Sequence, residues 1–144
     1  MKDEIYFKDV KPIEEHFRIL YSFLSDRKHN ISHRNIPTYD EHVDFVKKHP
    51  YRKWVIVESE SKVLGSLYIH TDNSIGINFD PKYIDLFPRI FKMITKRWRP
   101  LPEILSVRNK HFFVNIPSSN DALISVLKTM GAKHLQSSFV LDEH

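Results

Sequence analysis

The sequence predicts an α/β fold: a single domain spanning residues 1–144, in which a mixed β-sheet is flanked by helices. Three observations support this prediction. A chain of 144 residues suits one domain. Apolar residues make up 41% of the chain, which is enough for a packed core. Segments with helical spacing alternate with short strand-like runs, an order typical of a sheet whose later strands are joined by crossover helices.

The N-terminal third is expected to contain one strand and two helices. Weak alternation predicts a strand over 4–10, and the apolar spacing after Pro12 predicts a helix to about Ser25. Residues 26–37 show no period and are expected to form a loop. Thr38 and Glu41 form a capping box, which predicts that a second helix begins here and ends before Pro50.

Three strands of an antiparallel meander are expected next. Residues 54–57 form a short apolar run, and 63–69 form its hairpin partner across the turn at 59–62. A second turn at 71–74 leads to the third strand. In residues 74–79, Ile75, Ile77 and Phe79 alternate with small or polar residues, so this strand has one apolar face.

The C-terminal half is expected to alternate helices and strands. Apolar spacing predicts helices over 86–98 and 121–130, and strand-like runs occupy 112–115 and 134–141. Gly131 fits the position after the end of the fourth helix. Residues 101–111 fit no element, because Pro102 weakens a strand. Crossover helices predict that the later strands are parallel to their predecessors.

Composition excludes several classes of function. The chain has no cysteine, which rules out disulfides, thiolate nucleophiles and cysteine-ligated zinc. No other set of side chains suggests a metal site. The first ten residues are charged throughout and do not resemble a secretory signal, and the longest apolar runs are too short to span a membrane. We therefore expect a cytoplasmic protein.

The net charge of +4 makes the chain mildly basic. Much of the excess lies in residues 47–53 and 96–99, at the ends of two predicted helices, where cations favour the negative end of the helix dipole. We favour this interpretation over a nucleic-acid-binding patch. The charge also favours an anionic ligand, such as a nucleotide-bearing cofactor.

The joint after Phe79 is the most informative feature of the sequence. A strand followed by a turn and a helix often binds phosphate through backbone amides. Glycine normally permits this close approach, yet none occurs between Gly76 and Gly131. Pro88 lacks an amide donor near the start of the predicted helix, and the bulky Phe87 precedes it.

The order of elements resembles that of the GNAT superfamily of N-acyltransferases. Three pieces carry the resemblance over nearly the whole chain: residues 34–36 with 39–45, residues 54–58 with 62–67, and residues 114–115 with 120–133. The resemblance implies that acetyl-CoA binds in a wedge between two splayed parallel strands. A primary amine of a small molecule would then attack the thioester directly, with orientation supplying most of the rate.

The resemblance also implies a set of binding residues. The backbone of Ile77, Asn78 and Phe79 would pair with the pantetheine arm. Asn115 and Asn120 could hydrogen-bond the cofactor, although Asn120 fits a helix cap equally well. Arg34 and Tyr39 would lie on the acceptor side, although a tyrosine at this spacing is more often a core residue.

The pyrophosphate loop of the family, Arg/Gln-x-x-Gly-x-Gly/Ala, departs from its pattern here. It falls on residues 84–89, where Phe87 and Arg89 take the small positions. Lys82 and Arg89 could replace part of the backbone grip with side-chain donors. The tyrosine acid that the family often has in its last helix is replaced by Leu127.

Two residues are candidates for the base that takes a proton from the amine, namely Glu58 and His70. Each ends a predicted strand, so the alternative is a solvated strand end. The alternative function is a GNAT-fold binding or interaction module that has lost CoA binding. Assembly as a homodimer is compatible with either function.

Overall fold

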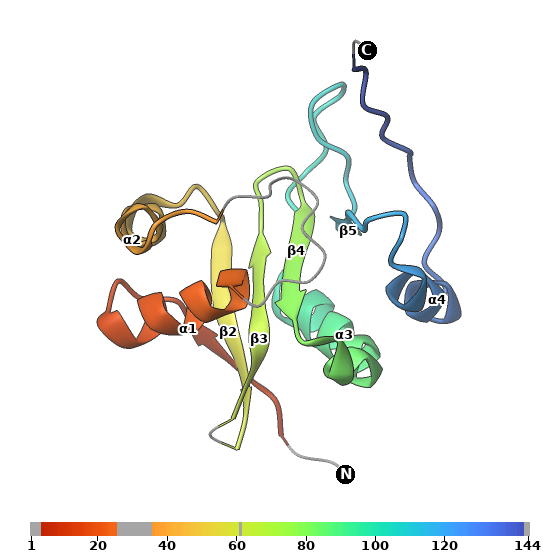
Figure 1. The fold of residues 1–144 in the computed structure, drawn as a ribbon. Helices are drawn as coiled ribbons and strands as arrows, with labels where there is room; N and C mark the ends of the chain where they lie inside the picture. The colour runs from red at the N-terminus through yellow and green to blue at the C-terminus, as the bar shows by residue number, and fades with distance from the viewer. Residues whose placement is uncertain (1–3, 26–35, 61, 143–144) are drawn as a thin grey trace.

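The computed structural model describes residues 4–25, 36–60 and 62–142. Its elements follow the order shown in Figure 1. They are β1 (Tyr6–Asp9), α1 (Glu14–Ser25), α2 (Tyr39–Lys48), β2 (Lys53–Ser59), β3 (Lys62–Ile69), β4 (Ser74–Phe79), the 3₁₀ helix η1 (Pro81–Leu86), α3 (Phe87–Arg97), β5 (Phe113–Val114) and α4 (Asp121–Thr129).

The strands form one mixed sheet in the order β1-β2-β3-β4-β5. The first four strands are antiparallel to their neighbours, while β5 is parallel to β4. The predicted meander and the predicted parallel crossover are therefore both confirmed. The fold class predicted from the sequence, a mixed sheet flanked by helices, is the one observed.

Alternation along β2 divides the core into two layers. Ile56 packs with Phe17 and Val46, so α1 and α2 cover one face of the sheet. Val55 and Val57 point to the other face, where they share a cluster with residues of α3 such as Ile94. Figure 1 shows α1 and α2 beside the first strands, with α3 and α4 toward the opposite edge of the sheet.

The helix termini form as local sequence patterns predict. The side chain of Thr38 accepts a hydrogen bond from the Glu41 amide at 3.2 Å, and the Glu41 carboxylate accepts one from the Thr38 amide at 2.8 Å. The Asn120 side chain caps α4 by accepting from the Leu123 amide at 3.3 Å. Gly131 follows α4 with a φ of +89°, a conformation that favours glycine.

The loop over residues 101–111 is held by one buried side chain. Asn73 is fully buried in the turn before β4. Its amide nitrogen donates to the carbonyls of Leu101 and Asn109 at 3.0 and 2.8 Å, and its oxygen accepts from the Leu101 amide at 2.7 Å. This asparagine therefore supplies backbone pairing that a strand would otherwise give. The residue also has a φ of +76°, which asparagine tolerates better than most side chains.

Two predictions for the C-terminal half are wrong. The predicted strand over 134–141 does not form, because residues 132–142 belong to no strand or helix and pair with no part of the described sheet. The joint after Phe79 is not a simple turn, because η1 intervenes before α3. No helix in the described part of the chain is long and apolar enough to cross a bilayer.

Candidate functional site

The parallel strands β4 and β5 diverge soon after they meet. β4 has six residues, but it pairs with β5 at two positions, Ser74 with Phe113 and Ile75 with Val114. On its other edge, β4 pairs with β3 as far as Phe79. Within the described residues, 76–79 therefore have a strand on the β3 side and none on the β5 side, and we call this unpaired side of β4 the wedge.

The direction of the backbone groups in β4 follows from two hydrogen bonds at its start. The Ser74 carbonyl accepts from His70 on the β3 side at 2.9 Å, and the Asn73 carbonyl accepts from Phe113 on the β5 side at 3.2 Å. Successive residues of a strand address alternate edges. Ile77 and Phe79 therefore direct their amides and carbonyls into the wedge, about 6.6–6.8 Å apart. Asn78 directs its backbone toward β3.

The joint at the open end of the wedge has little free backbone. Asp80 caps η1, because its carboxylate accepts from the Lys82 amide at 3.0 Å. The Phe87 amide donates to the Ile84 carbonyl of η1, and Pro88 has no amide hydrogen. The 3₁₀ turn thus uses a donor that would otherwise face a phosphate at the start of α3. In addition, η1 packs against α4.

Phe87 explains why this joint has no glycine. The side chain is 6% exposed and belongs to the main core. Its ring meets those of Phe79 and Phe91 edge to face, with centroids 5.2 and 6.0 Å apart. A residue that a phosphate loop would keep small is therefore used here to pack α3 beneath the sheet.

Basic side chains gather on the β3 side of the joint. The ammonium groups of Lys62 and Lys82 lie over the Tyr83 ring, 5.5 and 5.2 Å from its centroid. A hollow of ≈ 240 Å³ lies here and is lined in part by Lys62, Tyr83, Arg89 and the acidic Glu60. Of the two predicted phosphate donors, Arg89 lines this hollow, and Lys82 lies over the ring of Tyr83, which also lines it.

The α2-facing surface of the sheet carries stacked aromatic rings beside β4. The ring of Tyr68 lies directly over Gly76, because a Cβ placed on that glycine would fall 2.4 Å from the phenol oxygen. Tyr68 in turn stacks on Tyr51, with centroids 4.0 Å apart and ring planes 12° from parallel. His70 meets both rings edge to face, at 4.8 and 5.1 Å. A hydroxyl and an imidazole therefore stand on one face near the start of the wedge.

The two candidate bases lie at opposite ends of the sheet. Glu58 is opposite Val63, near the start of β3, whereas His70 follows the end of that strand. Seven residues of extended chain separate these positions by roughly 23 Å. The two residues are therefore too far apart to act on the same thioester carbonyl. The Glu58 carboxylate is also engaged by the Lys8 ammonium group of β1 at 3.2 Å.

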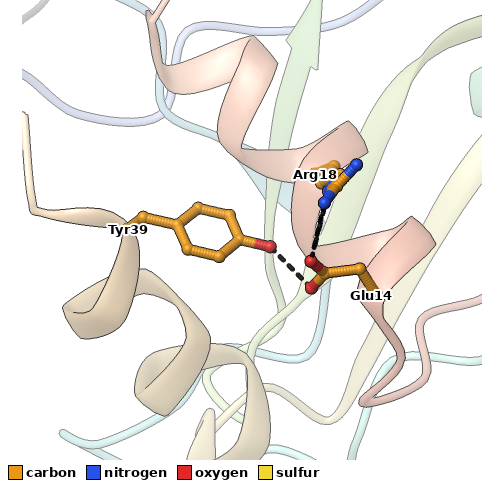
Figure 2. A network of polar contacts seen from close by, with 3 residues as sticks. All are labelled: Glu14, Arg18 and Tyr39. Carbon is orange, nitrogen blue, oxygen red and sulfur yellow. Dashed lines mark hydrogen bonds and ion pairs between the residues drawn. The ribbon is translucent and has the colours of Figure 1, made fainter.

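The remaining predicted site residues are scattered. Asn120 is committed to the α4 cap, while Asn115 is exposed directly after β5, where the strands diverge. Arg34 lies outside the described residues. Figure 2 shows that the Tyr39 hydroxyl donates to the Glu14 carboxylate at 2.9 Å, and that Arg18 contacts the same carboxylate at 3.0 Å.

This contact network ties α2 to α1. Partial burial and the hydrogen bond to Glu14 raise the pKa of Tyr39 above its ordinary value. In this structure Tyr39 therefore serves a structural contact between the two helices. Its predicted role on the acceptor side remains a proposal.

Sequence reasoning missed Tyr51 and Tyr68. The signal that could have revealed Tyr68 is the pairing of an aromatic residue in one predicted strand with glycine in the next, since a large ring often covers a glycine across a strand pair. The stack with Tyr51 could not be foreseen, because Tyr51 lies outside any strand. Within the described residues, no cluster of three or more His, Cys, Asp or Glu side chains is arranged to hold a metal ion.

Comparison with known proteins gives a clear result at the level of structure. No protein-family model matches the chain, and no curated protein matches its sequence. Aminoglycoside N-acetyltransferase AAC(6')-Iy, solved in complex with CoA, matches 99% of this chain over 97% of its own length, with a TM-score of 0.62 and 7% identity.

Two further structures agree with this match. An aminoglycoside acetyltransferase from an uncultured soil metagenomic sample, in complex with sisomicin, matches 97% of each chain with a TM-score of 0.57 and 11% identity. An integron cassette protein from the mobile metagenome of V. cholerae matches 100% of this chain and 94% of its own, with a TM-score of 0.58 and 12% identity. The chain therefore has the fold of the GNAT N-acyltransferases, and at these identities the likeness concerns the fold alone.

Proposed function

We propose that the protein is an acetyl-CoA-dependent N-acetyltransferase that acts on a primary amine of a small molecule. The observation that carries this proposal is the unpaired edge of β4 inside a GNAT fold. Ile77 and Phe79 direct four backbone groups into the wedge, and the pantetheine arm of CoA carries amides that can pair with such an edge. A sheet edge without a partner strand is otherwise a liability for a folded protein.

The transfer step asks little of the side chains. The amine nitrogen attacks the thioester carbonyl, the new C–N bond forms as the C–S bond breaks, and the electron pair leaves on the CoA sulfur. We assign His70, rather than Glu58, to accept the ammonium proton, since His70 stands on the same face as Tyr68 and beside β4. We also assign the hydroxyl of Tyr68, which covers Gly76, to donate a proton to the departing thiolate.

The phosphates of CoA would not be held here by the backbone amides of a glycine-rich loop. With Pro88 in place and the Phe87 amide occupied, the phosphates would depend on Lys82 and Arg89. Both side chains lie on the β3 side of the joint, so the nucleotide would have to pass the end of β4 to reach them. Side-chain cations are flexible and well hydrated, so binding should be weaker and more sensitive to salt than a backbone cradle. Asn115, at the divergence of the strands, is assigned to the arm.

A thermal-shift titration tests the proposal directly. A ligand at a hundred times its Kd stabilises the native state by about 2.7 kcal/mol, which for a chain of this size raises Tm by about 5–10 °C. Lys82→Ala should reduce the shift, while Lys96→Ala, an exposed lysine in the last turn of α3, should leave it unchanged. Failure of both acetyl-CoA and CoA to stabilise the protein at millimolar concentration would exclude the proposal.

A thiol-release assay then tests transfer. The panel of primary amines should include an aminoglycoside, because two of the structural neighbours are aminoglycoside acetyltransferases. His70→Gln should lower kcat and leave the thermal shift with acetyl-CoA intact. An equal loss of cofactor binding would show that His70 supports the fold of the site rather than proton transfer.

The buried Phe87 favours a second candidate function, a GNAT-fold binding module without CoA. Its ring and the η1 turn occupy the joint where the cofactor's phosphates would otherwise be held. This candidate predicts no thermal shift with either CoA species and no thiol release with any amine. The titration above therefore separates the two functions.

A further inference from the structure

Aromatic side chains of α2, β2, β3 and the residues beside them meet on the α2-facing surface of the sheet. The centroids of neighbouring rings lie 4.0–5.9 Å apart, and most pairs meet edge to face. The contacts are continuous, so the rings form one strip rather than separate pairs. We call it the aromatic strip, and its members are Phe45, His49, Tyr51, Trp54, Tyr68 and His70.

The aromatic strip lies outside the packed core. Phe45 is 44% exposed, and Tyr51 and Tyr68 are half-buried without joining either core cluster of the described chain. Trp54 is half-buried beside them, over the layer formed with α1 and α2. Aromatic rings that gather on a half-exposed surface are typical of ligand and partner sites.

One end of the aromatic strip lies at the wedge. Trp54 pairs with Tyr68 and Tyr68 pairs with Gly76, so these three positions form one row across β2, β3 and β4. The Tyr68 ring covers Gly76. Adjacent strands lie about 4.8 Å apart, so the row runs about 10 Å from Trp54 to Gly76. Gly76 directly precedes Ile77, whose backbone we assign to CoA, and the strip therefore leads to the place where the thioester would react.

The aromatic strip contains no acidic or permanently charged side chain. Burial lowers the pKa of His49 below its ordinary value, so this imidazole is mainly neutral at pH 7. The other polar groups of the strip are the hydroxyls of Tyr51 and Tyr68, the indole N–H of Trp54 and the imidazole of His70. Such a surface favours contact with the face or edge of another ring, and it offers no carboxylate of its own to a cation.

Basic side chains flank the aromatic strip at both ends. Lys47 and Lys48 are exposed in the last turn of α2. At the other end, the Arg108 guanidinium donates to the Thr71 carbonyl at 3.2 Å, in the turn after β3. A polycation would meet like charges here, at a cost that an acceptor with a single ammonium group largely avoids. Asp72, in the same turn, can balance one such group.

We propose that the aromatic strip binds the acceptor, and that the acceptor is an arylalkylamine, in which a short chain joins an aromatic ring to one primary amine. The proposal rests on the acetyltransferase function proposed above and names its substrate class. The ring packs against Tyr51 and Trp54, and the chain carries the amine past Tyr68 to the wedge.

The transfer to such an acceptor balances with the groups already assigned. The ammonium gives one proton to His70, and the neutral nitrogen forms the C–N bond as the C–S bond of acetyl-CoA breaks. The electron pair leaves on the sulfur, which Tyr68 protonates. The second proton of the nitrogen returns to Tyr68, so the products are an N-acetyl amide and CoA as its thiol.

Tyr51 lies at the centre of the aromatic strip. Its ring stacks on Tyr68, with centroids 4.0 Å apart. Its amide donates to Nδ1 of His49 at 3.1 Å, and the next amide, that of Arg52, donates to the Ile69 carbonyl of β3 at 2.8 Å. The ring is therefore held in place before an acceptor arrives, which lowers the entropic cost of binding. We assign Tyr51 to acceptor specificity.

A thiol-release assay with matched amines tests the proposal. The full chain and acetyl-CoA are given 2-phenylethylamine, butylamine or the aminoglycoside sisomicin. We expect kcat/KM for 2-phenylethylamine to exceed that for each of the others at least about 10-fold, because its ring packs on the strip. Tyr51→Ala should reduce the preference over butylamine about 10-fold, mainly by raising KM, and Tyr51→Phe should restore it. Tyr6→Ala is the matched control, since Tyr6 is 53% exposed on β1, at the other edge of the sheet.

A binding measurement keeps the proposal testable if Tyr51→Ala fails to fold. With CoA present, 2-phenylethylamine should shift the NMR signals of the His49 and His70 rings of the wild-type chain, because an aromatic ring changes the local magnetic field of its neighbours. Phe45→Ala changes an exposed position of α2 and should weaken this binding about 3-fold or more.

The outcomes separate the proposed acceptor from the function on which it rests. Suppose that acetyl-CoA stabilises the protein but kcat/KM for 2-phenylethylamine is no higher than for butylamine or sisomicin. The arylalkylamine alone would then be overturned, as it would be by histidine signals that 2-phenylethylamine leaves unchanged. Absence of both thermal stabilisation and thiol release with every amine would refute the acetyltransferase itself, and the proposed acceptor with it.

Discussion

Gly76 and Tyr68 provide a sharp test of how the floor of the wedge is built. An alanine Cβ at position 76 would lie 2.0 Å from Cζ of Tyr68 and 2.4 Å from its hydroxyl oxygen. Real side chains do not approach so closely, so the Tyr68 ring must tilt away. Because that ring stacks on Tyr51 at 4.0 Å, Gly76→Ala should break the stack.

The cost of Gly76→Ala follows from three effects. The lost stack removes about 0.5–1.5 kcal/mol. Forcing a side chain out of a packed position adds about 1–3 kcal/mol. Alanine stabilises the strand by about 0.5–1 kcal/mol relative to glycine, because glycine loses more backbone entropy on folding. We expect the free energy of unfolding to fall by about 1–3.5 kcal/mol, which lowers Tm by about 3–10 °C in a chain of this length.

A double-mutant cycle followed by urea denaturation distinguishes this mechanism from a general intolerance of β4. In the Tyr68→Ala background the obstructing ring is absent, so Gly76→Ala should become neutral or stabilise the protein. This reversal of sign is the expected result. If Gly76→Ala destabilises both backgrounds equally, the ring does not lie over Gly76 and the described floor of the site is wrong.

Three other predictions concern the scaffold. Asn73→Ala should cost about 3–5 kcal/mol in urea unfolding, because three partly buried backbone groups lose their partner. Asn109→Ala, which removes an exposed hydrogen bond, should cost about 1 kcal/mol or less. Thr38→Ala should cost about 0.5–2 kcal/mol by removing the cap of α2, and Thr38→Ser should restore it, as circular dichroism melts can show. Burial lowers the pKa of His42 below its ordinary 6.5, so the unfolded state binds the proton first as pH falls. The free energy of unfolding should therefore decline from pH 7 to pH 5. The variant His42→Gln should flatten that decline.

The pH prediction has a clear opposite outcome. The Nε2–H of His42 donates to the Phe17 carbonyl, 3.0 Å away, and a neutral imidazole can make this hydrogen bond while remaining uncharged in the core. If unfolding free energy rose as pH fell through 6.5, the buried imidazole would have to be charged in the folded state. That result would contradict the lowered pKa.

Elements set by local chemistry were predictable from the sequence. The capping box of Thr38 and Glu41 marks the start of α2, and Gly131 marks the end of α4, because both depend on groups a few residues apart. The meander was equally accessible, since alternation and short turns leave few alternatives for neighbouring strands. These features suffice for the fold class.

The candidate site could be predicted only in part. The sequence placed β4 and the joint after it correctly, and it showed that glycine is missing there. It could not show that Glu58 and His70 lie at opposite ends of the sheet, because that separation depends on strand register. Nor could it show that Tyr68 covers Gly76, since the contact joins two strands.

By itself, the sequence determined that this chain forms a mixed α/β sheet with an unusual strand-to-helix joint. The tertiary structure decided what that joint does: Phe87 turns into the core, η1 uses its amide, and the backbone of Ile77 and Phe79 has no strand partner on the β5 side among the described residues. It also decided that residues 132–142 join no strand or helix of the described chain. The physical reason is the same in each case, because local patterns set the conformation of a segment while pairing and burial depend on what the rest of the fold brings beside it.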